Sequence, residues 1–304
     1  MSDAPQHIPV MVDPVLQFLE PAAGKIVLDC TLGRGGHAAA IIPRLAPGGR
    51  YIGLDLDPSN IQAARQKFAD APVPCDFVHA NFAGAKAALD RLGVAGVDGL
   101  LADLGFSSWQ LEDPSRGLSF NRQGPLDMRL DPTGPTTAAD LVARLDEREL
   151  ADLIFNYGEE RASRRIARKI VEIRRVEPIK TTRQIAEICS WAYGPAAHRS
   201  RIDPATRTFQ ALRIAVNDEM GNLQALLEQM PRLMRLEGRA VVISFHSLED
   251  RLVKQAFAGW HVQGMARKLT KKPLIADESE QAANRRSRSA KLRAILFTMD
   301  SNRR

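Results

Sequence analysis

The sequence predicts an α/β fold, in which a parallel sheet carries helices on both faces and an all-α subdomain is inserted into it. Over roughly the first hundred residues, short apolar runs alternate with helical patterns, as they do in βαβ units. The next buried apolar run, 239–244, follows well over a hundred residues later, whereas a crossover needs only about a dozen. A structureless loop of that length is rare in a compact domain. The helical patterns between the two runs therefore predict an insert.

Each predicted strand is an apolar run, and each predicted helix has apolar residues at helical spacing. Pro58 stands where a helix begins, and Gly158 and Gly194 are helix stops. The predicted strands cover 26–28, 51–54, 77–78, 97–102, 239–244 and 292–299. One predicted helix begins near residue 36. The other predicted helices cover 58–68, 84–92, 137–145, 146–156, 159–175, 182–193, 204–234 and 247–258.

The helix expected over 159–175 has two contrasting faces. Ile166, Ile170 and Ile173 share one face, as a period of 3.6 residues requires. The opposite face is suited to RNA, or it is a solvent face with ion pairs to neighbouring glutamates, and the sequence favours neither interpretation. The arginines on that face are Arg161, Arg164, Arg165, Arg168 and Arg175.

Composition indicates a globular protein of the cytoplasm. A chain of 304 residues has enough core for one large domain or two smaller ones. No apolar run approaches membrane-spanning length, and the first residues lack the basic and apolar segments of a signal sequence. The three cysteines have no paired spacing and the six histidines are scattered. We therefore predict no disulfide and no metal site.

The formal net charge of +6 is concentrated near the C-terminus. Residues 260–304 contain eleven Lys or Arg and four Asp or Glu, which leaves the preceding 259 residues at a net charge of −1. Such a segment suits a phosphate backbone, although a solvated and partly disordered tail is the more common structure for a charge run. Its densest run consists of Arg285, Arg286, Arg288, Lys291 and Arg293.

Residues 29–37 (Asp-Cys-Thr-Leu-Gly-Arg-Gly-Gly-His) form a glycine-rich turn between a predicted strand and a helix. The glycines let backbone amides approach a ligand, and the helix directs its positive end toward it. This spacing also fits dinucleotides and ordinary strand-to-helix turns. Asp55, at the end of the second strand, is placed to bind a ribose diol. Asp29, where a pyrophosphate would otherwise lie, favours an ammonium or sulfonium group, and S-adenosylmethionine carries both.

Polar residues directly after strands are candidate site residues, because ligands bind outside the carboxyl ends of the strands in such sheets. The residues at these positions are Asp29, Asp55, Asn81 with Phe82, Asp103, and 244–246.

Several longer strings are specific enough to point to one family. They are His7-x-Pro9-Val10, Asp29-x-Thr31-x-Gly33-Arg34-Gly35-Gly36-His37, Asp103-Leu104-Gly105 with Ser107-Ser108-x-Gln110-Leu111, Gly124-Pro125-Leu126-Asp127-Met128-Arg129, Tyr157-Gly158-Glu159-Glu160, the run 204–214 and the run 244–251. Through them the chain resembles the ribosomal RNA small subunit methyltransferase H family nearly from end to end. Members of that family use S-adenosylmethionine to methylate N4 of a cytidine in the decoding region of 16S rRNA.

The resemblance implies a class I, Rossmann-like methyltransferase sheet with a helical insert. It implies a methyltransferase domain over 1–112 and 209–304, and an inserted substrate-recognition subdomain over 113–208. It also implies 16S rRNA as the partner, within the small ribosomal subunit, and it allows a homodimer. The cofactor contacts that it implies are Gly35, Gly36, His37, Asp55, Phe82, Asp103 and Gln110.

The N4 amine of cytosine is a poor nucleophile, because its lone pair is conjugated with the ring. An acceptor at the amine hydrogens would localise that lone pair and stabilise the positive charge that develops during transfer. We expect Asp103 to be this acceptor, acting with backbone carbonyls of Leu104 or Gly105, although a cap or a purely cofactor-binding carboxylate would give the same pattern. His246, also after a strand, is a second candidate for orienting the base or accepting a proton, or else a structural hydrogen-bonding residue.

Methylation at C5 of cytosine would instead require a thiolate that adds to the ring. Cys75 lies before the third strand rather than after the fourth, and Cys30 and Cys189 lie in a strand end and a helix interior. We expect all three to be packing residues, so the exocyclic nitrogen is the favoured target.

RNA capture would combine the basic C-terminal run, the arginine face of the insert and a loop that contains Arg116, Arg122 and Arg129. The target base would have to leave its stack to reach the cofactor. The aromatic residues near Asp103 would then offer a stacking surface, or they are buried packing residues. These aromatic residues are Phe106, Trp109 and Phe120.

Two other functions fit parts of the pattern. An NAD-dependent oxidoreductase would use the same glycine turn, and tight NAD binding would identify it. A noncatalytic rRNA-binding assembly factor would explain the basic tail but not the set of cofactor residues, and RNA binding without methyl transfer would identify it.

Overall fold

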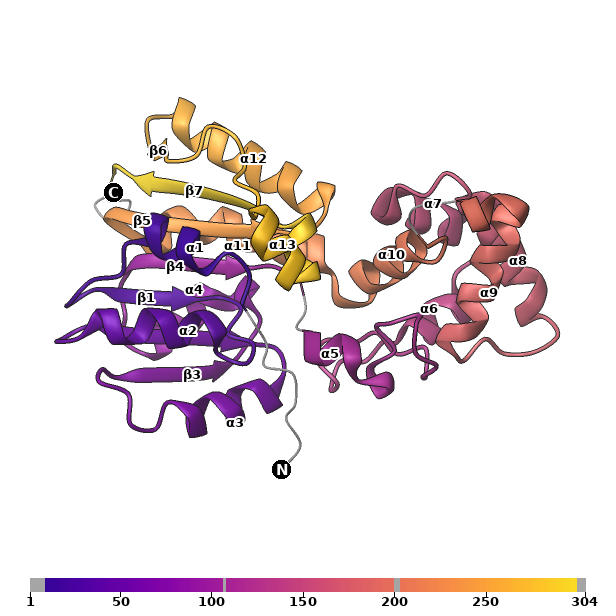
Figure 1. Ribbon diagram of the computed structural model, residues 1–304, viewed down its shortest axis with the longest axis horizontal. Helices are drawn as coiled ribbons and strands as arrows, with labels where there is room; N and C mark the ends of the chain where they lie inside the picture. The colour runs from indigo at the N-terminus through magenta and orange to yellow at the C-terminus, as the bar shows by residue number, and fades with distance from the viewer. Residues whose placement is uncertain (1–8, 106–107, 200–202, 300–304) are drawn as a thin grey trace. The chain divides into compact units, whose positions relative to one another are not determined.

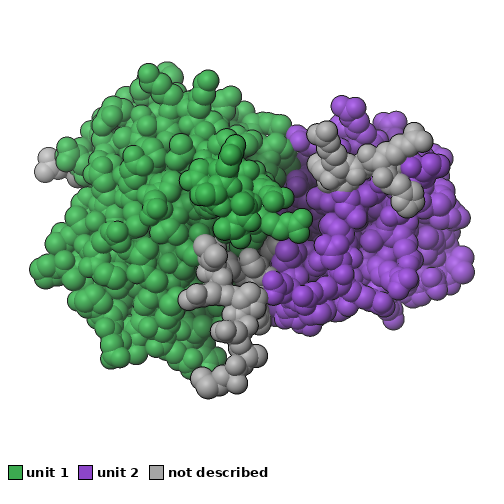
Figure 2. Space-filling model, in the orientation of Figure 1, with its two compact units in different colours: residues 1–105, 220–304 green, residues 106–219 purple. Residues whose placement is uncertain are grey.

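The structure is a computed structural model that describes residues 9–105, 108–199 and 203–299. The chain divides into two units, which Figure 2 shows in different colours. Unit 1 comprises Met1–Gly105 and Met220–Arg304, and unit 2 comprises Phe106–Glu219. Unit 2 is therefore inserted into unit 1 in the sequence. The functional division at 112/113 and 208/209 stays a prediction.

Unit 1 contains a seven-stranded sheet in the order β3-β2-β1-β4-β5-β7-β6 (Figure 1). The strands from β3 to β5 are parallel, and of the described strands β7 alone runs against the others. The strand order reverses at β1, which lies between β2 and β4, and such a reversal is where these sheets bind ligands. This topology confirms the predicted α/β fold with a Rossmann-like sheet. The strands are β1 (Ile26–Asp29), β2 (Arg50–Asp55), β3 (Cys75–His79), β4 (Val97–Asp103), β5 (Met234–Ser244), β6 (Ala266–Lys268) and β7 (Lys291–Phe297).

Helices cover both faces of the sheet and enclose an apolar core on each face (Figure 1). Val27 and Leu28 are neighbours in β1 but belong to opposite cores, because successive side chains of a strand alternate. Helices α4, α11 and α12 contribute to the core that contains Leu28, and α1, α2 and α3 contribute to the other. These elements are α1 (Val12–Leu19), α2 (Gly36–Ile41), α3 (Pro58–Lys67), α4 (Ala85–Arg91), α11 (Glu219–Leu233) and α12 (Ser247–Val262), with the 3-10 turns η1 (Ile42–Leu45) and η2 (Phe82–Gly84).

Unit 2 has an apolar core of its own. Thr137, Asp146 and Thr181 cap α6, α7 and α9 in capping boxes, which explains why these helices begin within about two residues of their predicted starts. Ile166 and Ile170 on α8 are fully buried, as the helical period predicted. No helix in the described ranges is long and apolar enough to cross a membrane. The elements of unit 2 are α5 (Ser108–Glu112), η3 (Pro114–Arg116), α6 (Ala138–Arg144), α7 (Glu147–Gly158), α8 (Ser163–Arg174), α9 (Thr182–Tyr193), η4 (Gly194–Arg199) and α10 (Thr206–Asn217).

The structure differs from the predicted elements in several places. The single helical pattern over 204–234 is two helices, because Asp218 adopts a left-handed conformation (φ 46°) that ends α10 before α11 begins. The strand predicted over 239–244 begins earlier, at Met234. The sequence did not predict α1, β6 or α13 (Glu278–Ala283), each of which is too short to show a clear periodicity.

The basic segment after residue 260 is folded through residue 299, which corrects the interpretation as a partly disordered tail. It forms β6, α13, the 3-10 turn η5 (Arg285–Ser289) and β7. Arg293 is only 8% exposed, and its Nε donates to Asp250 Oδ1 at 2.7 Å. Lys291 Nζ lies 3.7 Å from Asp250 Oδ2. Two cations of the densest basic run therefore pair with a carboxylate inside the fold.

We predict that Arg293→Leu lowers the free energy of unfolding by about 3 kcal/mol, because it removes the main partner of a largely buried carboxylate. Urea unfolding measures the change. Arg285→Leu, at an exposed position in η5, is the control and should cost less than about 0.5 kcal/mol. Equal losses in the two variants would contradict a structural role for Arg293.

The contribution of this pair should depend on pH. Burial acts to raise the pKa of Asp250, but hydrogen bonds from Arg293 and the nearby positive charges lower it overall. The stabilisation is therefore present above the pKa of the unfolded chain and is lost as the pH falls through the folded value. The difference in the free energy of unfolding between the wild type and Arg293→Leu should therefore become smaller at acidic pH.

Candidate active site

Three aspartates end adjacent strands of the sheet in unit 1. Asp29 ends β1, Asp55 ends β2 and Asp103 ends β4. In the parallel register, Asp29 lies opposite Gly53 of β2 and Leu101 of β4. The aspartates therefore lie at one edge of the sheet, the edge at which the strand pattern placed the site.

Backbone geometry explains the glycines in the turn after β1. Gly33 and Gly35 have φ angles of 52° and 69°, in the left-handed region that favours glycine. A Cβ atom on Gly35 would lie 2.6 Å from Cε2 of Phe68, and Gly36 follows as the first residue of α2. Lys67 Nζ donates to the carbonyl oxygen of Gly35 at 3.1 Å. The turn is therefore packed against the end of α3 and has no space for a side chain at residue 35.

Asp55 fixes the start of this turn. Its Oδ2 accepts a hydrogen bond from Gly33 N and its Oδ1 accepts one from Asp57 N, both at 2.7 Å. Burial raises the pKa of Asp55 above its ordinary value. The side chain of Asn60 also hydrogen-bonds to Asp55. A carboxylate has about four acceptor positions, so one remains for a ligand hydroxyl.

Asp29 does not face a ligand, which corrects the sequence interpretation. The residue is 1% exposed, and burial raises the pKa of its carboxyl group. Its Oδ2 accepts from Tyr51 Oη at 2.6 Å, and its Oδ1 accepts from Thr31 N at 2.9 Å. Asp29 therefore braces the turn and can influence a ligand only through its charge.

Asp103 is held next to the glycine turn by its own backbone. Asp103 N donates to Thr31 Oγ1 at 2.7 Å. The carboxylate is 13% exposed, and its Oδ2 lies 3.6 Å from His37 Nε2. That separation is too long for a hydrogen bond but short enough for a strong electrostatic interaction in a buried site.

His37 and Asp103 carry buried polar atoms that lack hydrogen-bond partners in the described part of the chain. These atoms are Nδ1 and Nε2 of His37 and Oδ1 of Asp103. Burial lowers the pKa of His37, but the negative charges of Asp103, Asp29 and Glu280 outweigh it and raise the pKa overall. Unsatisfied buried atoms are rare in folded proteins and cost free energy. Their grouping at the strand ends is typical of a site that receives a polar ligand.

The sequence did not predict two residues that support this group. Glu280 belongs to α13, and its Oε1 accepts a hydrogen bond from Met11 N at 2.6 Å. The two residues are 269 positions apart, and no local pattern indicates such a contact. Tyr51, fully buried in β2, looks like an ordinary strand aromatic in the sequence. The hydroxyl of Tyr51 links this residue to the site through its hydrogen bond to Asp29.

The other predicted site residues have different surroundings. Phe82 begins η2 after β3, where Asn81 caps the turn, and its ring packs partly against a core of unit 1. Gln110 lies in α5 of unit 2 and is 5% exposed there. His246 caps α12, and its Nε2 lies 3.2 Å from Glu249 Oε1. The cap is a structural role, and the roles of all three residues in a reaction stay predictions.

The predicted aromatic surface is only partly described. Phe120 packs edge to face on Phe209 within the core of unit 2, with ring centroids 5.4 Å apart. This contact supports the packing interpretation for Phe120. Phe106, His7 and the side chain of Trp109 lie outside the described residues.

All three cysteines are described, and burial raises the pKa of each thiol. The pKa rises well above its ordinary value for Cys30, to about 11 for Cys75 and to about 12 for Cys189. Each thiol is therefore protonated at neutral pH, and the prediction of packing residues rather than nucleophiles is supported by this chemistry.

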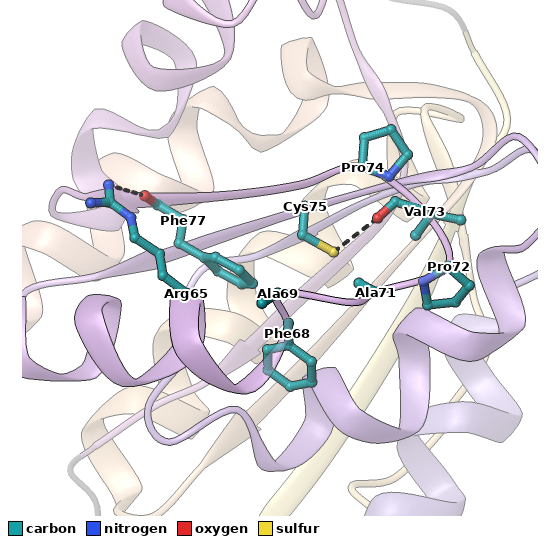
Figure 3. A pocket seen from close by; sticks show the side chains of 9 residues that line it. All are labelled: Arg65, Phe68, Ala69, Ala71, Pro72, Val73, Pro74, Cys75 and Phe77. Carbon is teal, nitrogen blue, oxygen red and sulfur yellow. Dashed lines mark hydrogen bonds between the residues drawn. The ribbon is translucent and has the colours of Figure 1, made fainter.

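Cys75 lines a cavity of about 480 Å³ between the end of α3 and the start of β3 (Figure 3). Its Sγ donates to Val73 O at 3.3 Å, and Arg65 Nη2 donates to Phe77 O at 3.1 Å, as the dashed lines show. The polar side chains of the lining thus have partners, and the cavity has no acid or base available for catalysis. Phe68 also lines it and is the residue that packs on Gly35.

Comparison with known proteins identifies one family. A model of the MraW methylase family matches residues 4–298. The relative from Sorangium cellulosum, a ribosomal RNA small subunit methyltransferase H, is 49% identical over 289 residues, which cover 95% of this chain and 90% of the relative. Relatives of the same name from Symbiobacterium thermophilum and Acidobacterium capsulatum are 46% and 47% identical, and they match 95% of this chain and 96% and 97% of their own lengths.

We predict that His37 titrates above its ordinary pKa of 6.5 and that Asp103→Asn lowers this pKa, because burial then outweighs the remaining negative charge. NMR titration of the imidazole measures both values. Asp76→Asn, which removes a carboxylate paired with Arg50, is the control and should leave the pKa of His37 unchanged.

The sign of the linkage follows from the raised pKa. Protonated His37 stabilises the folded state fully below the pKa of the unfolded chain, and this stabilisation is lost as the pH rises through the folded value. If the pKa of His37 in the wild type were at or below 6.5, the nearby carboxylates would not have the effect inferred for them.

Proposed function

Because the chain belongs to the MraW methylase family, we propose that it transfers a methyl group from S-adenosylmethionine to N4 of a cytidine in the decoding region of 16S rRNA. Family membership supports the reaction class, and the names of the relatives support ribosomal RNA as the substrate. The observation that carries the proposal to particular residues is the group of unsatisfied polar atoms on His37 and Asp103.

The carboxyl edge of unit 1 suits S-adenosylmethionine. Gly35 and Gly36 place no side chain at two positions of the turn, and Asp55 has acceptor capacity for a ribose hydroxyl. The negative charges of Asp103 and Asp29 favour a cationic group nearby. When bound, the cofactor supplies a methyl group that its sulfonium activates for in-line attack. Three further contacts, His37, Phe82 and Gln110, are carried over from the family resemblance.

In this proposal Asp103 accepts a hydrogen bond from the N4 amine. Two observations support this role: Oδ1 of Asp103 has no hydrogen-bond partner in the described residues, and Thr31 holds the backbone N of Asp103. Accepting an amine hydrogen localises the nitrogen lone pair. A carboxylate that is 13% exposed also stabilises the positive charge that develops on N4 more strongly than an exposed one would.

We infer that the same carboxylate receives the proton that N4 must lose after transfer. No covalent bond between enzyme and base is needed for this route, because the amine nitrogen is itself the nucleophile. The protonated thiols of Cys30, Cys75 and Cys189 support direct transfer over a thiolate addition at C5.

We assign the methyltransferase domain to 1–112 and 209–304 and the recognition of the RNA to the inserted subdomain, 113–208. The exposed arginines of α8 support this division, because phosphate contacts position RNA without reading its sequence. The substrate is 16S rRNA within the small ribosomal subunit, and a homodimer is compatible with the family.

We predict that Gly35→Ala weakens binding of S-adenosylmethionine by about tenfold or more, because the added Cβ displaces the turn from Phe68. Calorimetry measures the affinity. Gly93→Ala is a matched control, since its φ of 68° imposes similar backbone strain while no atom lies within 4 Å of the added Cβ. Equal affinities of the two variants would argue against a cofactor site at this turn.

We predict that Asp103→Asn lowers the single-turnover rate of methyl transfer to small ribosomal subunits by about 10²–10³-fold, because the amide lacks the charge that stabilises N4. The assay uses S-adenosylmethionine at a concentration that saturates the variant. Asp76→Asn should retain the wild-type rate. A wild-type rate for Asp103→Asn would exclude the proposed role of the carboxylate.

A further inference from the structure

Among its described residues, unit 2 presents two large aromatic rings at its surface, Phe155 on α7 (56% exposed) and Trp191 on α9. Trp191, on α9, is 51% exposed, whereas its helix neighbours Ile188 and Ala192 are almost fully buried in the core of the unit. Leaving an indole in water forgoes the stabilisation that its burial would provide. Packing of unit 2 alone therefore does not explain this position.

Two cations from the neighbouring helix lie over the Trp191 ring. Lys169 Nζ is 4.9 Å from the ring centroid, and Arg165 Cζ is 6.0 Å from it. Both side chains belong to α8 and are four residues apart, so they project from successive turns of one face. The indole and the two cations form a single surface, here called the Trp191 platform.

The platform continues into a basic helix face. Residues 161–175 contain seven Lys or Arg and one Glu. Arg174 is structural, since its Nη1 donates to the carbonyl oxygen of Leu145 at 2.6 Å. Arg164 and Arg168 are exposed on the same helix, and Arg161 is exposed just before it. Lys169 Nζ donates to Glu172 Oε1 at 2.8 Å, and Arg168 Nε lies 3.6 Å from Glu147 Oε1. The surface still carries an excess of positive charge, because its exposed arginines outnumber these two carboxylates.

We propose that the Trp191 platform binds an unpaired nucleotide of RNA, with its base stacked on the indole and its neighbouring phosphates on the α8 cations. This inference rests on the proposed function and extends it by naming where unit 2 holds the RNA. Aromatic rings flanked by Arg and Lys bind single-stranded nucleic acid, because every base has a face to stack and every nucleotide has a charge to neutralise. An acidic protein would complement the charge but would leave the indole face without a matching group.

The first test measures binding of the full chain to a fluorescein-labelled single-stranded RNA of about 12 nucleotides. Trp191→Ala should weaken binding about tenfold, and Trp191→Phe should restore most of it, because a phenyl ring still stacks. Arg183→Gln is the control, since Arg183 lies on the same helix as Trp191 and pairs with Glu187 at 2.8 Å. It should bind like the wild type.

The cations have a separate signature. The double variant Arg165→Gln with Lys169→Gln should reduce the slope of log K against log salt by about 0.7 to 1.4, since each phosphate contact on a single strand contributes about 0.7 and Lys169 is also paired with Glu172. If Trp191→Ala bound RNA with the same affinity as the wild type, the proposal would be overturned. It would also be overturned if Trp191→Ala lost binding to poly-glutamate but still bound RNA, because the surface would then be a site for an acidic protein.

Kinetics separate this inference from the proposed function. With small ribosomal subunits as substrate, Trp191→Ala should raise KM and leave kcat close to the wild-type value, because the platform holds RNA and does not touch the reacting atoms. If the wild type transfers no methyl group but Trp191→Ala still loses RNA affinity, the platform stands and the proposed reaction falls. If the wild type transfers the methyl group and Trp191→Ala changes neither KM nor RNA affinity, the proposed reaction stands and the platform is not an RNA site.

Discussion

The buried charges at the ends of β1 and β4 are the constraint on which unit 1 depends. Two carboxylates, Asp29 and Asp103, and the imidazole of His37 lie almost out of water, where each unpaired charge is costly. Tyr51 and Thr31 hydrogen-bond both oxygens of Asp29, and Thr31 also fixes the backbone of Asp103. The fold thus provides partners for both oxygens of one carboxylate, whereas Oδ1 of the other has none among the described residues. The raised pKa of His37 reports the same negative field.

This difference between neighbouring carboxylates gives the site its chemistry. Asp29 and Asp55 hydrogen-bond to backbone amides of the glycine turn and hold it in place. Of the three aspartates, Asp103 alone combines low exposure with an oxygen that lacks a partner in the described residues, the combination that an acceptor for a weakly nucleophilic amine requires. Unit 2 contributes a different kind of chemistry, since its outward cations and the exposed Trp191 suit recognition of RNA rather than catalysis.

The sequence predicted the features that local patterns encode. Apolar runs placed the strands, so the aspartates at their ends could be found, and capping residues such as Thr137 and Asp146 placed the helices of unit 2. Contacts between distant residues could not be predicted in this way. Charge alone does not reveal that Arg293 folds back onto Asp250, and the spacing of Asp29 does not reveal that a tyrosine from the next strand covers it. The ligand-facing role expected for Asp29 was therefore wrong, and its structural role emerged only from the packing.

Identifying the methylated atom tests directly whether the protein transfers the methyl group to N4 of cytidine. Small ribosomal subunits that lack the modification are incubated with the protein and isotopically labelled S-adenosylmethionine, and the 16S rRNA is digested to nucleosides for mass spectrometry. We expect label in N4-methylcytidine at one site in the decoding region. Label in 5-methylcytidine would contradict the amine mechanism and implicate a thiol, and absence of label in cytidine would contradict the proposed substrate.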